Sequence, residues 1–271
     1  MRALPGRLVL LGHPVAHSLS PRFQNAALRR AGISVVYEAV DVPPAELRRA
    51  LTELRAIRAA GNVTIPHKES AAALCDGLTP VARRAGAVNT FWIEGGRLIG
   101  DNTDVGGFDT VARDVLGALG PPNPIRVAVI GAGGAAAAVL TALERWSGAR
   151  VGVFSRSAER TQRLCERFGQ LAEPAHSAAD AVSGAALVVN ATPIGLADET
   201  MPVDPALLDP RAVAIDLVYR RAGTAWTRAV TRLGHRAVDG TDMLLEQGAL
   251  AFQRWFGVPA DRAVMRAALL E

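Results

Sequence analysis

Lys68 is the only lysine in this chain of 271 residues, and arginine supplies the rest of its 30 basic Lys and Arg residues. A lysine ammonium can be shifted toward neutral pH when it loses water, whereas a guanidinium stays protonated. A lysine kept in a chain that otherwise uses arginine is therefore a candidate proton donor and acceptor. The alternative is that compositional bias left one lysine by chance, so its neighbours must decide.

Polar groups suited to proton transfer accompany Lys68 in three segments. Residues 62–68 (NVTIPHK) predict a strand ended by proline, which turns Thr64 and Lys68 toward a common cleft. Asn89 lies in AVNT and Asp104 in GDNTD, on separate loops. A carboxylate beside an amine orients it and shares its proton. Taken singly, Asn89 and Asp104 are equally well explained as turn residues.

The segment His17-Ser18-Leu19-Ser20-Pro21 predicts a helix start with Ser20 at the N-cap and Pro21 at the first helical position. Capping requires only Ser20. Ser18 adds a second hydroxyl near the positive end of the helix dipole, which favours a site for a small carboxylate. A purely structural explanation for the pair stays open.

A glycine-rich turn follows the apolar strand expected at residues 127–130 and precedes a helix. In the dinucleotide-binding pattern, Gly131 permits the tight turn, Gly133 lets the backbone approach a pyrophosphate, and Ala136 is small where helix meets strand. The helix N-terminus then holds the diphosphate. The predicted contacts are Gly131, Ala132, Gly133, Gly134 and Ala135.

The end of the next strand, at residues 151–154, indicates which dinucleotide is bound. An NAD enzyme places an acidic residue there, but this chain has Ser155-Arg156-Ser157. Arg156, together with Arg160, offers guanidinium groups that match the geometry of a 2′-phosphate. The sequence therefore favours NADP over NAD. The alternative is that both are solvated arginines at a helix start.

These segments must be positioned by regular elements, and the sequence predicts an α/β fold. Strands expected at 7–12, 35–41 and 62–65 alternate with helices at 21–31 and 44–58, which is typical of a mainly parallel sheet. Prolines at 121, 122 and 124 precede a second series with strands at 125–130, 151–154, 187–190 and 212–218. Residues 239–271 read as helical and are expected to pack against the first half.

Composition excludes several classes of protein. With 49% hydrophobic and 21% charged residues, the chain should fold throughout. The net charge of +4 comes from arginines scattered among acidic residues, which favours anionic small molecules over nucleic acid. The N-terminal apolar run is too short for a secretion signal and no segment reaches membrane-spanning length, so we expect a cytoplasmic protein. Cys75 and Cys165 have no metal-ligand or disulfide spacing, and no metal is expected.

Taken together, the motifs resemble the shikimate dehydrogenase family over nearly the whole chain. The matching segments are GHPVAHSLSP, NVTIPHK, AVNT, GDNTD, GAGGA, NATPIG, DLVY and MLLEQGALAF. The resemblance implies reversible, NADP-dependent reduction of 3-dehydroshikimate to shikimate, in the route to chorismate and aromatic amino acids. It implies a substrate-binding and catalytic domain at 1–104 and 240–271 and a Rossmann-type NADP domain at 105–239.

By the same resemblance, Lys68 and Asp104 form the catalytic pair. The residues implied for the substrate are Ser18, Ser20, Thr64, Lys68, Asn89, Asp104, Tyr219 and Gln247. Those implied for NADP, besides the glycine-rich turn, are Ser155, Arg156, Arg160, Asn190, Thr192 and Met243.

The chain departs from the family pattern at three places. Gln24 stands where histidine is usual, Ser155 replaces an asparagine and so loosens the case for strict NADP preference, and Asp242 replaces a glycine. Two other functions remain open: a quinate/shikimate dehydrogenase of relaxed specificity, and a non-catalytic NADP-binding sensor. Retention of both Lys68 and Asp104 argues against the sensor. We expect a monomer or homodimer.

Overall fold

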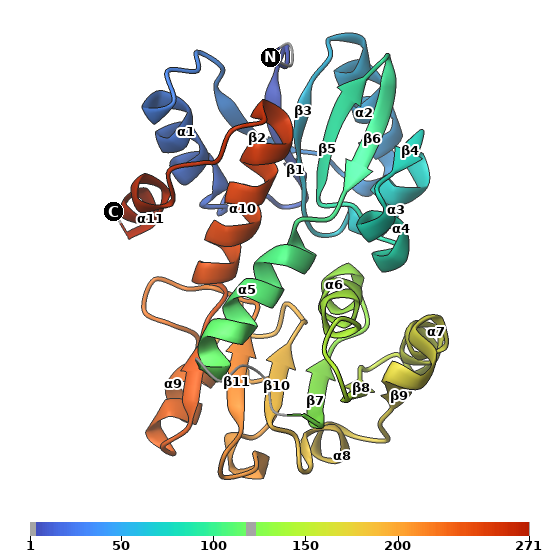
Figure 1. Ribbon diagram of the computed structural model, residues 1–271, viewed down its shortest axis with the longest axis vertical. Helices are drawn as coiled ribbons and strands as arrows, with labels where there is room; N and C mark the ends of the chain where they lie inside the picture. Colours follow the sequence, from blue (N-terminus) through green and yellow to red (C-terminus); the bar gives the residue numbers. More distant parts are fainter. Residues whose placement is uncertain (1–3, 118–122, 271) are drawn as a thin grey trace. The chain divides into compact units, whose positions relative to one another are not determined.

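The computed structural model describes residues 4–117 and 123–270, which form two compact units (Figure 1). Unit 1 runs up to Gly107 and resumes at Leu244, and unit 2 comprises Phe108–Met243. Each unit contains one six-stranded sheet, which confirms the predicted α/β fold. The prolines at 121 and 122 lie outside the described residues. No described helix is long and apolar enough to span a membrane.

The sheet of unit 1 has the strand order β2-β1-β3-β5-β6-β4. Strand β1, the second from one edge, pairs in parallel with β2 and β3. All residues of β1 are buried; Leu8 and Leu10 join one apolar cluster, whereas Val9 and Leu11 join another. Burial on both faces is characteristic of parallel strands. The strands are β1 (Leu8–Gly12), β2 (Tyr37–Asp41), β3 (Ala60–Val63), β4 (Gly77–Leu78), β5 (Thr90–Glu94) and β6 (Arg97–Asp101).

Helices cover both faces of this sheet. The predicted helix at 44–58 is a 3-10 turn, Pro44–Glu46, followed by α2 (Leu47–Ala56), which packs beside α3 (Lys68–Leu74) and α4 (Pro80–Ala85). On the other face, α1 (Ser20–Arg30) packs with α10 (Thr241–Phe256) and α11 (Arg262–Leu270), the red helices of Figure 1. The expected return of the C-terminal helices to the first half is confirmed.

Gly248 of α10 packs directly against Phe23 of α1. A Cβ there would lie 2.4 Å from Cε2 and 2.7 Å from Cζ of the Phe23 ring. We expect Gly248→Ala to lower the free energy of unfolding. Overpacking against Phe23 should cost about 1–3 kcal/mol, whereas the better helix propensity of alanine should return ~1 kcal/mol. Urea unfolding measures this free energy. The control is Gln253→Ala at an exposed position of the same helix, whose stability should stay within about 0.5 kcal/mol of the parent. An unchanged or raised midpoint for Gly248→Ala contradicts the packing argument.

A hairpin formed by β5 and β6 was not predicted from the sequence, and neither were α3, β4 and α4. Strand β5 is antiparallel to both β3 and β6. Gly95 and Gly96 connect the strands with φ values of 57° and 74°, as a tight two-residue hairpin turn requires. The opposite end of the hairpin places Thr90 beside Asp101. The segments AVNT and GDNTD, expected as separate loops, are therefore joined by strand pairing.

The sheet of unit 2 is parallel throughout, with the order β12-β11-β10-β7-β8-β9. If β7 is counted as the first strand, this is the 3-2-1-4-5-6 order of dinucleotide-binding sheets. Such sheets bind their ligands where the strand order reverses, which here lies beyond the ends of β7 and β10. The predicted strands at 125–130 and 187–190 are confirmed; the short edge strands β9 and β12 were not predicted. The strands are β7 (Ile125–Ile130), β8 (Ala149–Phe154), β9 (Ala172–Pro174), β10 (Leu187–Asn190), β11 (Val213–Asp216) and β12 (Arg236–Val238).

The helices of unit 2 complete its βα repeats. Buried Ala128, Val188 and Ala214 from three neighbouring strands pack with Trp226 in one apolar cluster. The helices are α5 (Asp104–Leu116), whose first turn belongs to unit 1, α6 (Gly134–Leu143), α7 (Ala158–Phe168), α8 (Ala178–Val182) and α9 (Ala225–Arg232).

Candidate active site and dinucleotide site

Lys68 and Asp104 form a shielded ion pair in unit 1. Lys68 is the first residue of α3 and Asp104 the first of α5. The Lys68 Nζ lies 2.6 Å from Oδ2 of Asp104, and their side chains are only 17% and 6% exposed. Restricted solvent access strengthens such a pair. The structure thus places a carboxylate where it can orient the amine and share its proton.

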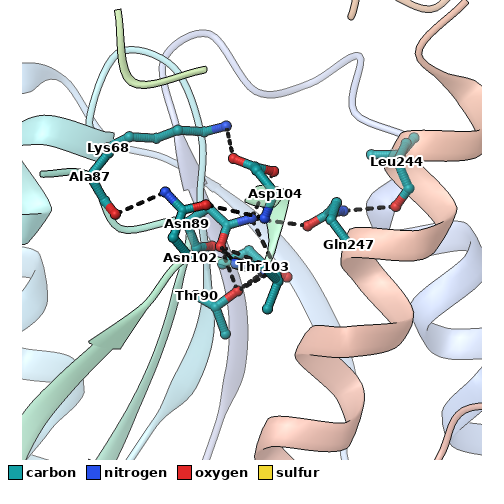
Figure 2. A network of polar contacts seen from close by, with 10 residues as sticks. Lys68, Ala87, Asn89, Thr90, Asn102, Thr103, Asp104, Leu244 and Gln247 are labelled. Carbon is teal, nitrogen blue, oxygen red and sulfur yellow. Dashed lines mark hydrogen bonds and ion pairs between the residues drawn. The ribbon is translucent and has the colours of Figure 1, made fainter. Parts of the chain in front are cut away.

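Asn89 holds the second oxygen of Asp104 (Figure 2). Its Nδ2 donates to Asp104 Oδ1 over 2.8 Å and to Oγ1 of Thr103 over 3.0 Å. Its Oδ1 accepts from the backbone N–H of Thr103, at 2.7 Å, and from the hydroxyl of Thr90, at 2.9 Å. Because a backbone N–H can only donate, these bonds fix which end of the Asn89 amide faces Asp104. Both oxygens of the carboxylate are therefore positioned.

Gln247 approaches the same group from α10. Its Oε1 lies 3.3 Å from Asn89 Nδ2, and its Nε2 donates to the Leu244 carbonyl over 2.8 Å. The structure thus brings together Lys68, Asn89, Asp104 and Gln247. Thr64 is half-buried just beyond β3, and none of the hydrogen bonds among the described residues joins its side chain to these four.

A second layer of buried amides supports the site, and the sequence analysis did not assign it. Asn62 Nδ2 donates to the Asn89 carbonyl and the Thr90 hydroxyl, and its Oδ1 accepts from the hydroxyl of Tyr37 at 2.8 Å. Asn102 Nδ2 donates to the Ala87 carbonyl, and Asn102 Oδ1 accepts from the backbone N–H of Asp104. Asn62 lies in the motif NVTIPHK and Asn102 in GDNTD. The sequence signal for their role was the presence of polar residues at the ends of buried strands.

The two serines at the start of α1 are arranged differently from the prediction. The helix begins at Ser20 itself, and Leu19 occupies the N-cap position without a side-chain cap bond. Ser18 Oγ accepts from the Ser20 backbone N–H at 3.2 Å. The prediction that Ser20 is the N-cap is therefore wrong, because the turn made by Ser18 already bonds the Ser20 amide. Ser18 is half-buried and Ser20 buried.

The glycine-rich turn of unit 2 lies at the point where the strand order reverses. Gly131 follows β7 with a φ of 128°, and a Cβ there would lie 2.7 Å from the Ala191 carbonyl oxygen. Gly133 is the N-cap of α6 and supplies no side-chain cap bond, whereas α7 and α9 are capped by Ser157 and Thr224. The first-turn amides of α6 thus have no side-chain acceptor at the cap, as an anion site requires. The turn fits a dinucleotide diphosphate.

Arg156 is the exposed cation at the end of β8. None of the hydrogen bonds or ion pairs among the described residues involves its guanidinium. Ser155 Oγ bonds the Ser157 carbonyl and the Thr161 hydroxyl, at 3.1 and 2.9 Å, so it shapes the turn. Arg160 is also exposed and donates its backbone N–H to the Ser157 cap.

The remaining predicted residues of unit 2 are partly or fully buried. Asn190, at the end of β10, is fully buried, and its side chain bonds Asp216 and Thr192. Tyr219 is half-buried and Met243 is 7% exposed. Among the described residues, no group of three His, Cys, Asp or Glu side chains is arranged to hold a metal ion.

Comparison with known proteins identifies related families. Residues 10–91 match the shikimate dehydrogenase substrate binding domain, and residues 240–270 match the shikimate 5′-dehydrogenase C-terminal domain. Residues 126–217 match a model described as NADP oxidoreductase, coenzyme F420-dependent.

Whole-length relatives agree with these domain matches. The chain is 44% identical to shikimate dehydrogenase (NADP(+)) of Rubrobacter xylanophilus, over 96% of this chain and 94% of that protein. A crystal structure of shikimate 5-dehydrogenase from Thermus thermophilus in complex with NADP(H) and shikimate has a TM-score of 0.85 and 41% identity, covering 98% of both chains. Quinate dehydrogenase from Corynebacterium glutamicum in complex with NAD has a TM-score of 0.86 and 28% identity, covering 97% of this chain and 98% of the other.

Proposed function

Because the chain belongs to the shikimate dehydrogenase family, we propose that it catalyses the reversible NADP-dependent interconversion of shikimate and 3-dehydroshikimate. The observation that carries this proposal is the 2.6 Å pair of Lys68 and Asp104, with Asn89 on the other carboxylate oxygen. In the direction of 3-dehydroshikimate reduction the enzyme serves aromatic amino acid biosynthesis in the cytoplasm.

Lys68 moves the proton of the reaction. When bound, the nicotinamide of NADP exchanges a hydride with the substrate carbon. The oxygen on that carbon must gain or lose a proton at the same time, and Lys68 Nζ is the group that gives or takes it. Asp104 Oδ2 holds Nζ in place, and Asn89 prevents the carboxylate from rotating away.

Further residues of unit 1 bind the rest of the substrate. Asn89, Asp104 and Gln247 present amide and carboxylate groups to ring hydroxyls, and Thr64 adds its hydroxyl. Ser18 and Ser20 bind the substrate carboxylate through their hydroxyls at the start of α1. Tyr219, which belongs to unit 2, is the remaining substrate-binding residue of the proposal. Residues 1–104 and 240–271 thus form the substrate domain.

Residues 105–239 form the NADP domain, and Met243, just beyond it, also belongs to the NADP site. The turn from Gly131 to Ala135 and the first turn of α6 receive the diphosphate, because those amides lack a side-chain cap acceptor. Arg156, together with Ser155 and Arg160, receives the 2′-phosphate. Thr192 and Met243 complete the site, and Asn190 contributes through Thr192.

Initial rates measured by nicotinamide absorbance test the proposal, with shikimate and quinate each offered NADP⁺ and NAD⁺. We expect a rate confined largely to shikimate with NADP⁺. Faster turnover of quinate with NAD⁺ would favour the activity named for the Corynebacterium relative. Tight NADP⁺ binding without turnover of either substrate would instead support a sensor.

A further inference from the structure

Asp216 is a fully buried carboxylate at the end of β11 that has no part in the proposed chemistry. Its Oδ1 accepts from Asn190 Nδ2 at 2.8 Å and from the backbone N–H of Val218 at 3.0 Å. Its Oδ2 accepts from the Thr224 hydroxyl at 2.7 Å. Burial raises the pKa of the Asp216 carboxyl above its ordinary value, and the hydrogen bonds from Thr224, Val218 and Asn190 oppose that rise.

The bond from Asp216 to Asn190 fixes the orientation of the Asn190 amide. Asn190 Nδ2 donates to both Asp216 Oδ1 and the Ile194 carbonyl, the latter at 3.2 Å. Asn190 Oδ1 accepts from the backbone N–H and the hydroxyl of Thr192, at 3.0 and 2.6 Å. The Thr192 hydroxyl oxygen accepts in turn from the Ile194 N–H at 3.1 Å. One buried amide therefore sets the path of residues 191–194.

These residues lie directly against the glycine-rich turn. The Ala191 N–H donates to the carbonyl of Ile130, the last residue of β7, over 2.8 Å. The Ala191 carbonyl oxygen and Thr192 Cγ2 lie 2.7 and 3.2 Å from the position that a Cβ of Gly131 would occupy. A displacement of this loop would consequently change the shape of the turn, at the place where dinucleotide-binding sheets receive their ligand.

We propose that Asp216 is a positioning residue for the dinucleotide, which acts through Asn190 to hold residues 191–194 against the Gly131 turn. This inference rests on the proposed function, because NADP is the ligand whose site it shapes. The essential feature is the acceptor at Oδ1. The bond at Oδ2 joins Asp216 to the N-cap of α9 and serves stability alone.

Three variants separate positioning from stability. Asp216→Ala removes the acceptor for Asn190, and we expect NADP⁺ to bind about 10-fold more weakly, as for one orphaned buried donor. Asp216→Asn keeps an oxygen for Asn190 and Val218, while the Thr224 hydroxyl can turn to donate to Thr227 Oγ1, 3.2 Å away. Its affinity should stay within about 3-fold of the parent. Thr224→Val removes the Oδ2 bond and the α9 cap bond from the Thr227 N–H, but it keeps the Oδ1 acceptor for Asn190. It should therefore lower stability and leave affinity unchanged.

NADP⁺ affinity is measured by isothermal titration, urea unfolding gives stability, and steady-state rates give the KM for NADP⁺ and kcat. We expect Asp216→Ala to raise the KM for NADP⁺ while kcat at saturating NADP⁺ is retained. Equal loss of affinity in Asp216→Ala and Thr224→Val would overturn the inference, since both would then act through stability. If Asp216→Ala does not fold, Asn190→Leu removes the same hydrogen bond between Asn190 and Asp216. Asn190→Leu must then weaken NADP⁺ binding while Thr224→Val leaves it unchanged. A parent protein that fails to bind NADP⁺ would instead overturn the proposed function.

Discussion

Replacing Lys68 with alanine should lower kcat for shikimate oxidation by about 10²–10⁴-fold, the usual contribution of a positioned acid-base group. The KM for shikimate should change far less, because Asn89, Asp104 and Gln247 remain to bind the ring hydroxyls. The amine is held 2.6 Å from Asp104, and the Lys68 side chain is 17% exposed. Initial rates at saturating NADP⁺ measure both constants.

Two further substitutions separate proton transfer from charge and folding. Lys68→Arg keeps a positive charge beside Asp104, but a guanidinium does not release its proton, so we expect it to be nearly as inactive as Lys68→Ala. Ser70→Ala changes an exposed residue on the same short helix and should retain the parent rate. A near-normal kcat for Lys68→Ala would remove Lys68 from the mechanism, and full activity of Lys68→Arg would reduce its role to electrostatics.

Residue type made Lys68 a candidate, but it could not show what holds the amine. Asn89 and Asp104 were each as compatible with a turn as with a site. The hairpin between β5 and β6, through Gly95 and Gly96, sets the positions of the segments that carry them. The Gly-Gly pair is a recognisable hairpin signal. The roles of Asn62 and Asn102 could not be assigned from the sequence, because most of their partners, backbone carbonyls and the hydroxyls of Tyr37 and Thr90, are brought close only by the fold.

Unit 2 was more predictable because its pattern is local. A strand, a glycine-rich turn and a helix follow one another directly, so β7, Gly131 and α6 could be recognised from adjacent residues. Asp216 could not, since its partners come from β10 and from the N-cap of α9. Ser20 shows the opposite failure: the residue type fitted an N-cap, yet the preceding Ser18 turn shifted the cap to Leu19.

Replacing Arg156 with alanine should weaken NADP⁺ binding by about 10–100-fold, the value of a charge-assisted hydrogen bond to phosphate. NAD⁺ lacks the 2′-phosphate, so its affinity should change by less than about 2-fold. The guanidinium is exposed, at the end of the strand whose position in such sheets selects between the two dinucleotides. Titration of each variant with NADP⁺ and NAD⁺ gives the ratio directly.

The matched control for this experiment is Arg163→Ala, on the adjoining helix α7. Arg163 is exposed as well but is paired with Glu159, so its loss should leave both affinities near the parent values. If Arg156→Ala and Arg163→Ala weaken NADP⁺ binding equally, the loss comes from the reduced positive charge of the surface and not from a specific contact. If Arg156→Ala weakens NADP⁺ and NAD⁺ alike, Arg156 does not bind the 2′-phosphate. Preference for NADP⁺ would then have to come from Arg160 or from the Ser155 turn.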